Sequence, residues 1–258
     1  MPSSPPVRPP RPNDLTEARA YFASVSEVVM RIETAAELAT VIEWFKEGVR
    51  RIGAEVGTFL SCIHDDEYKT CRFLLACDPA WFLEYEKRAW NKDDPWLEYC
   101  RRHAEPTRAS DIPVRTGAQA DIVRLASRFG FRSTVVVPAS VGGGLSRLGM
   151  LCLGCADPHR FEDNGILALK VAALPLAASL NRWCTARARE ELLQSTHLSS
   201  QDLLLLDLLR QGLSTKHMAE ITGKSTKSIN SRFQRINAKL RVPTRKAAAR
   251  RAAEYGLI

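Results

Sequence analysis

Apolar positions near the start of the chain recur with the period of an α-helix. They fall at intervals of three and four residues, which places their side chains on one helical face. The two sets are Val25, Val28, Val29 and Ile32, then Leu38, Ile42, Phe45, Val49 and Ile52. This pattern predicts two amphipathic helices, over 13–32 and 35–52.

Apolar runs of strand length follow. Two of them lie within "EVGTFLSCIHDDEYKTCRFLLAC" and meet at "HDDE", which predicts a hairpin. Two more, "STVVVPAS" and "SRLGMLCLGCA", flank the glycine-rich "VGGGLS". Helical spacing covers 80–89, 95–103, 117–129 and, with a bend near Pro175, 162–193. The order of these elements predicts an α+β fold, an α/β/α sandwich whose antiparallel sheet has helices on both faces.

The composition changes at "ELLQSTHLSSQD", a polar stretch that we interpret as a linker. Beyond it, "QDLLLLDLLRQG" and "TKHMAEI" predict two helices, and the turn "TGKS" leads into a third helix from Ser225 to about Leu240. A final helix is predicted over 244–255. The sequence therefore predicts an extended tail over 1–13, a first domain over 14–193 and an all-α helix-turn-helix domain over 194–258.

The last quarter of the chain carries the whole charge excess. From Leu198 onward there are twelve Lys and Arg against four Asp and Glu, whereas the preceding residues hold 25 of each sign. A positive charge concentrated in this way is the electrostatic footprint of a protein that binds a polyanion. A merely solvated polar surface is the alternative, but three helices with a tight glycine turn coincide with the charge, which favours DNA binding.

The third helix of this basic region has two kinds of face. Ile229, Phe233, Ile236 and Leu240 form an apolar stripe for a core. The polar faces carry side chains of the types that contact base edges and phosphates in a major groove. The residues that we predict to contact DNA are Lys224, Thr226, Lys227, Asn230, Ser231, Gln234, Arg235 and Lys239.

"WFLEYEKRAWNKDDPW", residues 81–96, is unusually aromatic and contains adjacent carboxylates. Trp81 and Tyr85 are four residues apart, so both rings can line one cavity. A buried Asp94 beside them would need a hydrogen-bond donor, which a ligand amide can supply. In the alternative interpretation the aromatic residues are core packing and Asp94 is a helix N-cap before Pro95. Both can hold together.

Catalysis is the rival class of function. Asp93 with Asp94, or Glu84 with Glu86, offers carboxylates, but positions so close in sequence seldom face each other. "VGGGLS" lacks the Lys-Ser/Thr of a phosphate-binding loop. The sequence therefore predicts a protein that is not an enzyme and that holds no cofactor.

The seven cysteines do not form the pattern of a small disulfide-rich domain, so reduced thiols are expected. Cys152 and Cys155 form a CxxC, but in a strand they point to opposite faces and cannot share a metal. We expect buried structural thiols and no metal site. The absence of a signal-like apolar segment and of a bilayer-length apolar run predicts a cytoplasmic protein with no membrane span.

The basic region resembles the LuxR-type transcription regulators. The resemblance rests on a Leu-Ser opening, two Gly-x-Ser motifs, Lys-Leu, Val-x-x-Arg and the final "YGLI", which are met by Leu198, Ser199, Gly212, Ser214, Gly223, Ser225, Lys239, Leu240, Val242 and Arg245. This chain differs from the family at three positions: Asp202 and His217 stand where it has glutamates, and Arg232 where it has a histidine.

The first domain looks like the autoinducer-binding domain of the same family. Trp81, Tyr85, Asp94 and Pro95 match pocket residues, and the resemblance implies that Trp81 donates to a lactone carbonyl and Asp94 accepts an amide proton. Three further pocket positions depart from the family pattern: Ala109 replaces a Trp, Thr134 replaces a Gly, and Cys77 replaces the Tyr of some members. The resemblance therefore implies a reshaped pocket.

These observations together predict a homodimeric, ligand-responsive regulator of transcription. It would sense an acyl-homoserine lactone or a related amide-containing molecule and bind a palindromic double-stranded operator. The alternative is a ligand-independent or redox-responsive DNA-binding regulator whose first domain serves only dimerisation.

Overall fold

The computed structural model describes residues 15–64, 69–89, 92–139, 147–161 and 166–258. The predicted tail over 1–13 and the segment "VGGGLS" lie outside the described residues. The elements in chain order are α1 (Leu15–Thr34), α2 (Leu38–Ile52), β1 (Val56–His64), β2 (Lys69–Ala76), α3 (Pro79–Lys87), α4 (Pro95–Arg102), β3 (Thr107–Arg108), the short 3₁₀ helix η2 (Ala109–Asp111), α5 (Gly117–Arg128), β4 (Ser133–Pro138), β5 (Arg147–Cys155), α6 (Ile166–Thr196), α7 (Ser200–Arg210), α8 (Thr215–Thr222), α9 (Thr226–Leu240) and α10 (Arg245–Glu254).

The chain forms two compact units. The first comprises Met1–Ser61 with Cys71–Trp183, and the second comprises Cys62–Thr70 with Cys184–Ile258. The boundary at Trp183 lies inside helix α6, which therefore contributes to both units.

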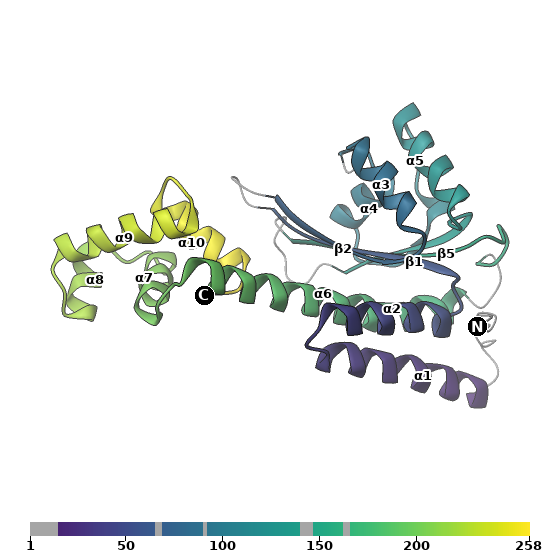
Figure 1. Ribbon diagram of the computed structural model, residues 1–258, viewed down its shortest axis with the longest axis horizontal. Coiled ribbons are helices and arrows are strands. Elements are labelled where there is room, and N and C mark those ends of the chain that lie inside the picture. Colours follow the sequence, from purple (N-terminus) through teal and green to yellow (C-terminus); the bar gives the residue numbers. More distant parts are fainter. Residues whose placement is uncertain (1–14, 65–68, 90–91, 140–146, 162–165) are drawn as a thin grey trace. The chain divides into compact units, whose positions relative to one another are not determined.

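The first unit is a sheet between two layers of helices. Its strands have the order β2-β1-β5-β4-β3, and β4 pairs antiparallel with both β3 and β5, with Val135 opposite Leu153. Figure 1 shows α1, α2 and the first part of α6 on one face, and α3, α4 and α5 on the other. The predicted α/β/α sandwich is confirmed.

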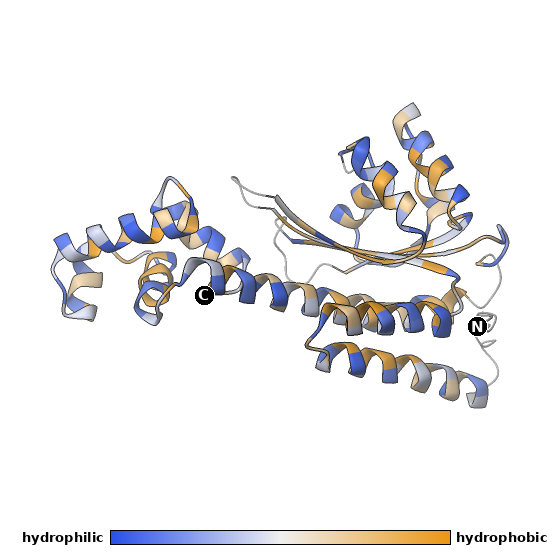
Figure 2. Cartoon of the chain, viewed as in Figure 1, coloured by the Kyte–Doolittle hydropathy of each residue, from blue (hydrophilic) through white to orange (hydrophobic). Residues whose placement is uncertain are grey.

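Burial on both faces explains the sequence of the central strands. Every residue of β4 is buried, as is every residue of β5 after Arg147. A strand covered on both faces needs apolar side chains at successive positions rather than at alternate ones. In Figure 2 hydrophobic colour predominates along the middle of the sheet, whereas α1 and α2 carry both hydrophobic and polar colour.

Close contacts hold the α1–α2–α6 layer together. A Cβ added at Gly48 of α2 would lie 3.1 Å from Val28 of α1 and 3.2 Å from Leu176 of α6, so the three helices meet at that glycine. Asn181 of α6 donates to the carbonyl of Ala139 at 2.6 Å and accepts from the Ser61 hydroxyl at 3.1 Å. These bonds satisfy buried polar groups and tie α6 to the sheet.

The second unit contains the helix-turn-helix. A hydroxyl side chain accepts a backbone N–H at the start of each of its helices α7 to α10, which satisfies one of the donors that a helix start leaves free. Gly223, at φ +65°, ends α8, and an L side chain rarely adopts that conformation. The predicted stripe of α9 is buried. The four hydroxyl caps are Ser199, Ser214, Ser225 and Thr244.

Two expectations from the sequence are wrong. Most of the predicted linker "ELLQSTHLSSQD" is helical, because α6 continues through Pro175 to Thr196 and α7 begins at Ser200. Leu192 and Leu193 pack against the apolar core of the second unit, which favours helix over an extended linker. Cys62 and Cys71, on β1 and β2, are disulfide-bonded rather than reduced, while Cys77, Cys100, Cys152, Cys155 and Cys184 are free.

No helix among the described residues is long and apolar enough to cross a membrane.

The packing of β5 gives a testable prediction. A Cβ at Gly154 would lie 2.5 Å from Phe131, 2.8 Å from Val56 and 3.0 Å from the carbonyl oxygen of Gly130. We expect Gly154→Ala to lower the free energy of unfolding of the first unit by about 1–3 kcal/mol, because Phe131, Val56 and the backbone at Gly130 would all have to move to make room for the methyl group. Urea denaturation followed by tryptophan fluorescence measures this, since all five tryptophans precede Cys184.

Gly117→Ala is the matched control. A Cβ at Gly117, the first residue of α5, meets nothing within 4 Å. Its free energy of unfolding should stay within about 0.5 kcal/mol of wild type or rise slightly. Equal stability of the two variants would show that β5 is not packed as tightly as described.

Candidate functional site

Helix α3 places Trp81 and Tyr85 on one buried face. Asp78 caps the helix by accepting the N–H of Ala80, and Pro79 occupies its first position. The four-residue spacing then stacks the two rings, whose centroids are 5.1 Å apart. Trp81 is 5% exposed and Tyr85 3%, so the aromatic pair faces the interior of the first unit, as both a pocket wall and core packing require.

Asp94 is a buried carboxylate that caps the next helix. Its Oδ1 accepts the backbone N–H groups of Trp96 at 2.8 Å and Leu97 at 3.2 Å, at the start of α4. Its Oδ2 accepts the phenol O–H of Tyr85 at 2.8 Å. The N-cap interpretation is therefore confirmed, and the Tyr85 bond adds a link to α3. Asp93 is exposed, so the two carboxylates do not form a facing acid/base pair.

The surroundings shift the acidity of this pair. Burial raises the pKa of Asp94 above its ordinary value, although the O–H of Tyr85 and the N–H groups of Leu97 and Trp96 act in the opposite direction. Burial, and next the charge of Asp94, raise the pKa of Tyr85, so the phenol stays a donor. The site thus holds a carboxyl group whose charged form is costly to bury, with fixed donors around it.

Aromatic rings surround the pair. Phe131, which precedes β4, lies with its ring centroid 5.8 Å from that of Trp81 and 6.5 Å from that of Trp96. The ring centroid of Phe73, on β2, lies 6.4 Å from that of Tyr85. Sequence reasoning did not assign Phe131 or Phe73 to the site, because nothing in their local patterns separates a pocket wall from core.

The other predicted pocket residues are placed around the same sheet face. Pro95 is buried at the first position of α4, and Cys77, at the end of β2, is half-buried. Burial, and next the charge of Asp78, raise the pKa of the Cys77 thiol to about 12. Strand β3 ends with Arg108, which pairs with Val135, and the next residue, Ala109, begins η2, which contacts the strand β4 that carries Thr134. The two departures from the family pattern therefore lie on elements that contact each other.

Thr134 is buried, and its hydroxyl group is engaged in a hydrogen bond. Its hydroxyl donates to the carbonyl of Phe131 at 3.0 Å. The same residue that supplies an aromatic ring to the site is thus held by one of the positions that depart from the family pattern. A substitution that removes the Thr134 hydroxyl would therefore release the backbone of Phe131 and alter the position of its ring.

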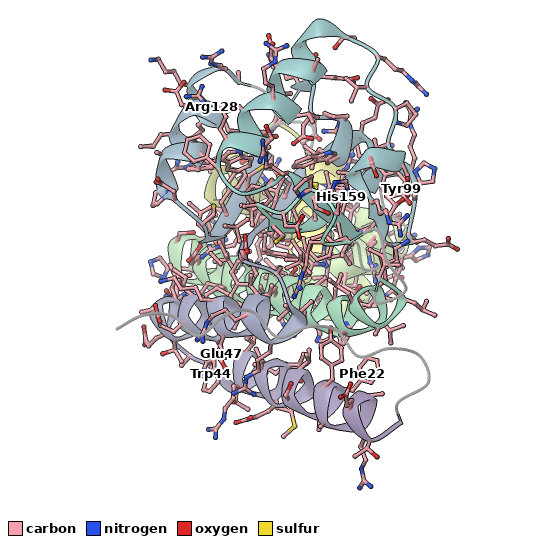
Figure 3. The ribbon with its side chains drawn as sticks, turned by 90° about the vertical axis from the view of Figure 1, so that its right-hand side faces the viewer. Phe22, Trp44, Glu47, Tyr99, Arg128 and His159 are labelled. Atoms are coloured by element: carbon pink, nitrogen blue, oxygen red, sulfur yellow. The ribbon has the colours of Figure 1, made fainter. Side chains whose placement is uncertain are left out.

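Figure 3 separates the two sides of the first unit. Phe22 and Trp44 lie on the side of α1 and α2, whereas Arg128 and Tyr99 lie on the side of α3 to α5. The aromatic and carboxylate cluster belongs to elements of the latter side. In the parts of the chain that the structure describes, no cluster of three or more His, Cys, Asp or Glu side chains could hold a metal ion.

The second candidate site is the outer face of α9. All eight residues predicted to contact DNA are exposed, while Ile229, Phe233, Ile236 and Leu240 are buried. The amide oxygen of Asn230 accepts a hydrogen bond from Arg245 at 2.8 Å. A helix with one apolar and one polar, basic face is suited to a major groove.

Lys239 differs from the other predicted DNA contacts. Its ammonium donates to the carbonyl of His197 at 2.7 Å and to the buried carboxylate of Asp202 at 3.1 Å. Arg232 also binds Asp202, through Nε at 2.7 Å. Burial acts to raise the pKa of Asp202, but the backbone N–H of Ser199, Arg232 and Lys239 lower it to about 2. Lys239 and Arg232 therefore join α9 to the start of α7.

The Tyr85–Asp94 bond yields a prediction. Tyr85→Phe removes the donor to a buried carboxylate oxygen, and we expect it to lower the free energy of unfolding of the first unit by about 1–3 kcal/mol at pH 7. Without the phenol the pKa of Asp94 rises further. The deficit should therefore be smallest where Asp94 is protonated in both states, below its ordinary pKa, and grow as pH rises through the raised pKa.

Tyr99→Phe provides the comparison. Tyr99 donates to the carbonyl of Glu105 at 2.9 Å in an exposed setting, so its loss should change the unfolding free energy by less than about 0.5 kcal/mol. Urea titrations of both variants between pH 4 and pH 8 test the expectation. A pH-independent deficit in Tyr85→Phe would show that the bond to Asp94 does not carry the effect.

Solved structures share this fold. A structure of SdiA from Escherichia coli has a TM-score of 0.64 and 15% identity, covering 92% of this chain and 99% of that one. A structure of SdiA in complex with octanoyl-rac-glycerol has a TM-score of 0.62 and 14% identity, covering 92% of this chain and 96% of that one. At such identities the likeness shows a common fold.

No curated protein matches the sequence significantly. The autoinducer binding domain family, in contrast, matches residues 38–182, more than half of the chain, and this range includes Trp81, Tyr85 and Asp94. Regulators of this family bind small-molecule ligands and are not enzymes. The chain therefore belongs to the autoinducer-binding-domain family and is a LuxR-type quorum-sensing regulator of transcription.

Proposed function

We propose that this regulator binds an acyl-homoserine lactone, or a related amide-containing small molecule, beside Trp81, Tyr85 and Asp94. We further propose that it acts in the cytoplasm as a homodimer and binds a palindromic double-stranded operator through α9. The observation that carries the ligand proposal is the buried carboxylate of Asp94, which is surrounded by aromatic rings.

The carboxylate of Asp94 has room for one more donor. Oδ1 accepts two N–H groups and Oδ2 accepts one O–H, while a carboxylate offers about four acceptor positions. A ligand amide N–H would complete the set and would offset part of the cost of burial. The indole N–H of Trp81 is the donor that we assign to the lactone carbonyl.

The reshaped part of the pocket is local. Ala109 removes the bulk of a tryptophan, and Thr134 adds a side chain where the family pattern has none. Ala109 and Thr134 lie on contacting elements, η2 and β4, and a threonine side chain is smaller than an indole, so the added side chain would fill only part of the space that the missing ring leaves. We therefore propose a ligand that is broader at that end than a simple acyl-homoserine lactone.

An exposed apolar stripe on α6 supports the homodimer. Leu167, Val171 and Leu174 recur at helical spacing and are 63%, 50% and 40% exposed. Three large apolar side chains on one helical face favour burial against a second copy. A dimer would present two copies of α9 to half-sites about one helical turn of DNA apart.

DNA binding through α9 is tested with Arg235→Ala. Operators are first selected from random duplexes with the wild-type protein. We expect the variant to lower operator affinity about tenfold and to reduce the slope of log affinity against log salt by about one, because one phosphate contact is lost. Electrophoretic mobility shifts at several salt concentrations measure both quantities.

Arg128→Ala removes the same charge from α5 in the first unit, where Arg128 is exposed. It should leave both the affinity and the salt slope unchanged. Equal losses of operator affinity in the two variants would show that the effect comes from net charge alone. An unchanged affinity in Arg235→Ala would exclude α9 as the helix that contacts the operator.

The ligand site is tested by thermal unfolding with N-octanoyl-homoserine lactone. The octanoyl chain is chosen because the similar protein SdiA has been solved with octanoyl-rac-glycerol. At a hundredfold excess over the dissociation constant, a ligand of the folded state adds about 2.7 kcal/mol of stability. Trp81→Ala should abolish this stabilisation, whereas Trp44→Ala, on α2, should retain it.

A matched pair of ligands tests the contribution of the amide N–H to binding. The ester analogue α-octanoyloxy-γ-butyrolactone has the same shape but no N–H for Asp94, so it should stabilise the wild type less. Equal stabilisation by amide and ester would contradict the role of Asp94. A full shift in Trp81→Ala would place the ligand elsewhere.

The disulfide-bonded Cys62 and Cys71 favour a second candidate, a redox-responsive regulator. Operator affinity measured with and without dithiothreitol, in the absence of ligand, distinguishes the two. An affinity that changes on reduction but not on addition of any acyl compound would favour the redox function.

A further inference from the structure

Arg245, the first residue of α10, is fixed by contacts to two other helices. Its guanidinium lies over the ring of Phe233, 4.6 Å from the centroid, and Phe233 is wholly buried. Nη1 lies 3.3 Å from the hydroxyl of Thr215 at the start of α8, and Nη2 donates to Oδ1 of Asn230 at 2.8 Å. Stacking on a buried ring and two polar contacts leave the guanidinium little freedom.

The contact with Arg245 fixes which end of the Asn230 amide faces outward. A guanidinium has donors only, so the group that it meets at 2.8 Å must be the amide oxygen, whichever way the amide is drawn. The Nδ2 group, with its two N–H donors, therefore occupies the other branch of the side chain. Asn230 is exposed on α9, between Lys227 and Gln234 on the same helical face.

A free asparagine amide reads adenine by a bidentate contact, in which the oxygen accepts from N6 and the nitrogen donates to N7. Here the oxygen already accepts a charge-assisted bond from Arg245, which lowers its capacity as an acceptor. The nitrogen is unaffected and matches acceptors such as O6 and N7 of guanine. The amino group of adenine would meet donors rather than an acceptor.

We propose that Arg245 is a positioning residue that turns the NH2 of Asn230 toward the major groove, so that this position of the operator is read as guanine rather than adenine. This inference rests on the proposed function, because it requires that α9 binds duplex DNA. It adds a base preference and a residue, outside the recognition helix, that sets it.

The test is selection of duplexes from a random pool by the full-length protein, followed by measurement of base preference at each position. The variants are Asn230→Ala, Arg245→Met and, as a matched control, Lys246→Met. Lys246 is the next residue of α10 and is exposed, so its substitution removes the same charge without touching Asn230.

Wild type and Lys246→Met should share one pattern, with guanine preferred over adenine by about tenfold at one position of each half-site. Asn230→Ala should reduce the preference at that position to about twofold or less. Arg245→Met should reduce or reverse it there, because the released amide can turn and pair with adenine. The other positions of the half-site should keep their preferences, which a general loss of folding would not produce.

Retention of the wild-type pattern by Arg245→Met, or adenine at the Asn230 position in wild type, would overturn the inference alone. A uniform loss of preference at all positions by Arg245→Met would assign it a structural role and also overturn the inference. Asn230→Asp keeps the oxygen and removes the N–H donors, so it should lose the guanine preference even if Arg245→Met does not fold. Absence of any enrichment by wild type would overturn the proposed function itself.

Discussion

The buried carboxylate of Asp94 is the interaction on which the first unit's site depends. An ionised group in an apolar interior is costly unless donors surround it. Here the first turn of α4 supplies two N–H groups and Tyr85 of α3 supplies an O–H. The same carboxylate therefore starts one helix, anchors another and leaves acceptor capacity in a cluster of aromatic rings. Capping and ligand binding are compatible uses of one side chain, because a carboxylate has more acceptor positions than a helix start needs.

In the second unit, charge has two separate uses. Arg232 and Lys239 bind the buried Asp202 and hold α9 to the start of α7. Arg235 and Lys227 are exposed on α9 and keep their charge for a partner. Counting basic residues therefore overstates the charge that this unit has available for a partner. Only the contacts distinguish a cation that is part of the fold from one that is available for binding.

Local signals predicted most elements because those signals act within a few residues. Asp-Pro at 94–95 marked a helix start, and the apolar stripe of α9 marked its buried face. The linker prediction is wrong because Leu192 and Leu193, within this polar stretch, pack against apolar residues that lie far away in the sequence. The disulfide of Cys62 and Cys71 was missed for a related reason: spacing does not show which cysteines oppose each other across paired strands.

The sequence by itself determined the α/β/α sandwich, the helix-turn-helix, the basic character of the second unit and the pairing of Trp81 with Tyr85 on one helical face. These follow from periodicity, capping and charge, which operate at short range. Tertiary structure alone decided that Tyr85 donates to Asp94, that Lys239 binds Asp202 and that Arg245 holds the amide of Asn230. Each of these contacts joins two elements through side-chain geometry, and a one-dimensional pattern contains no information on how two elements meet.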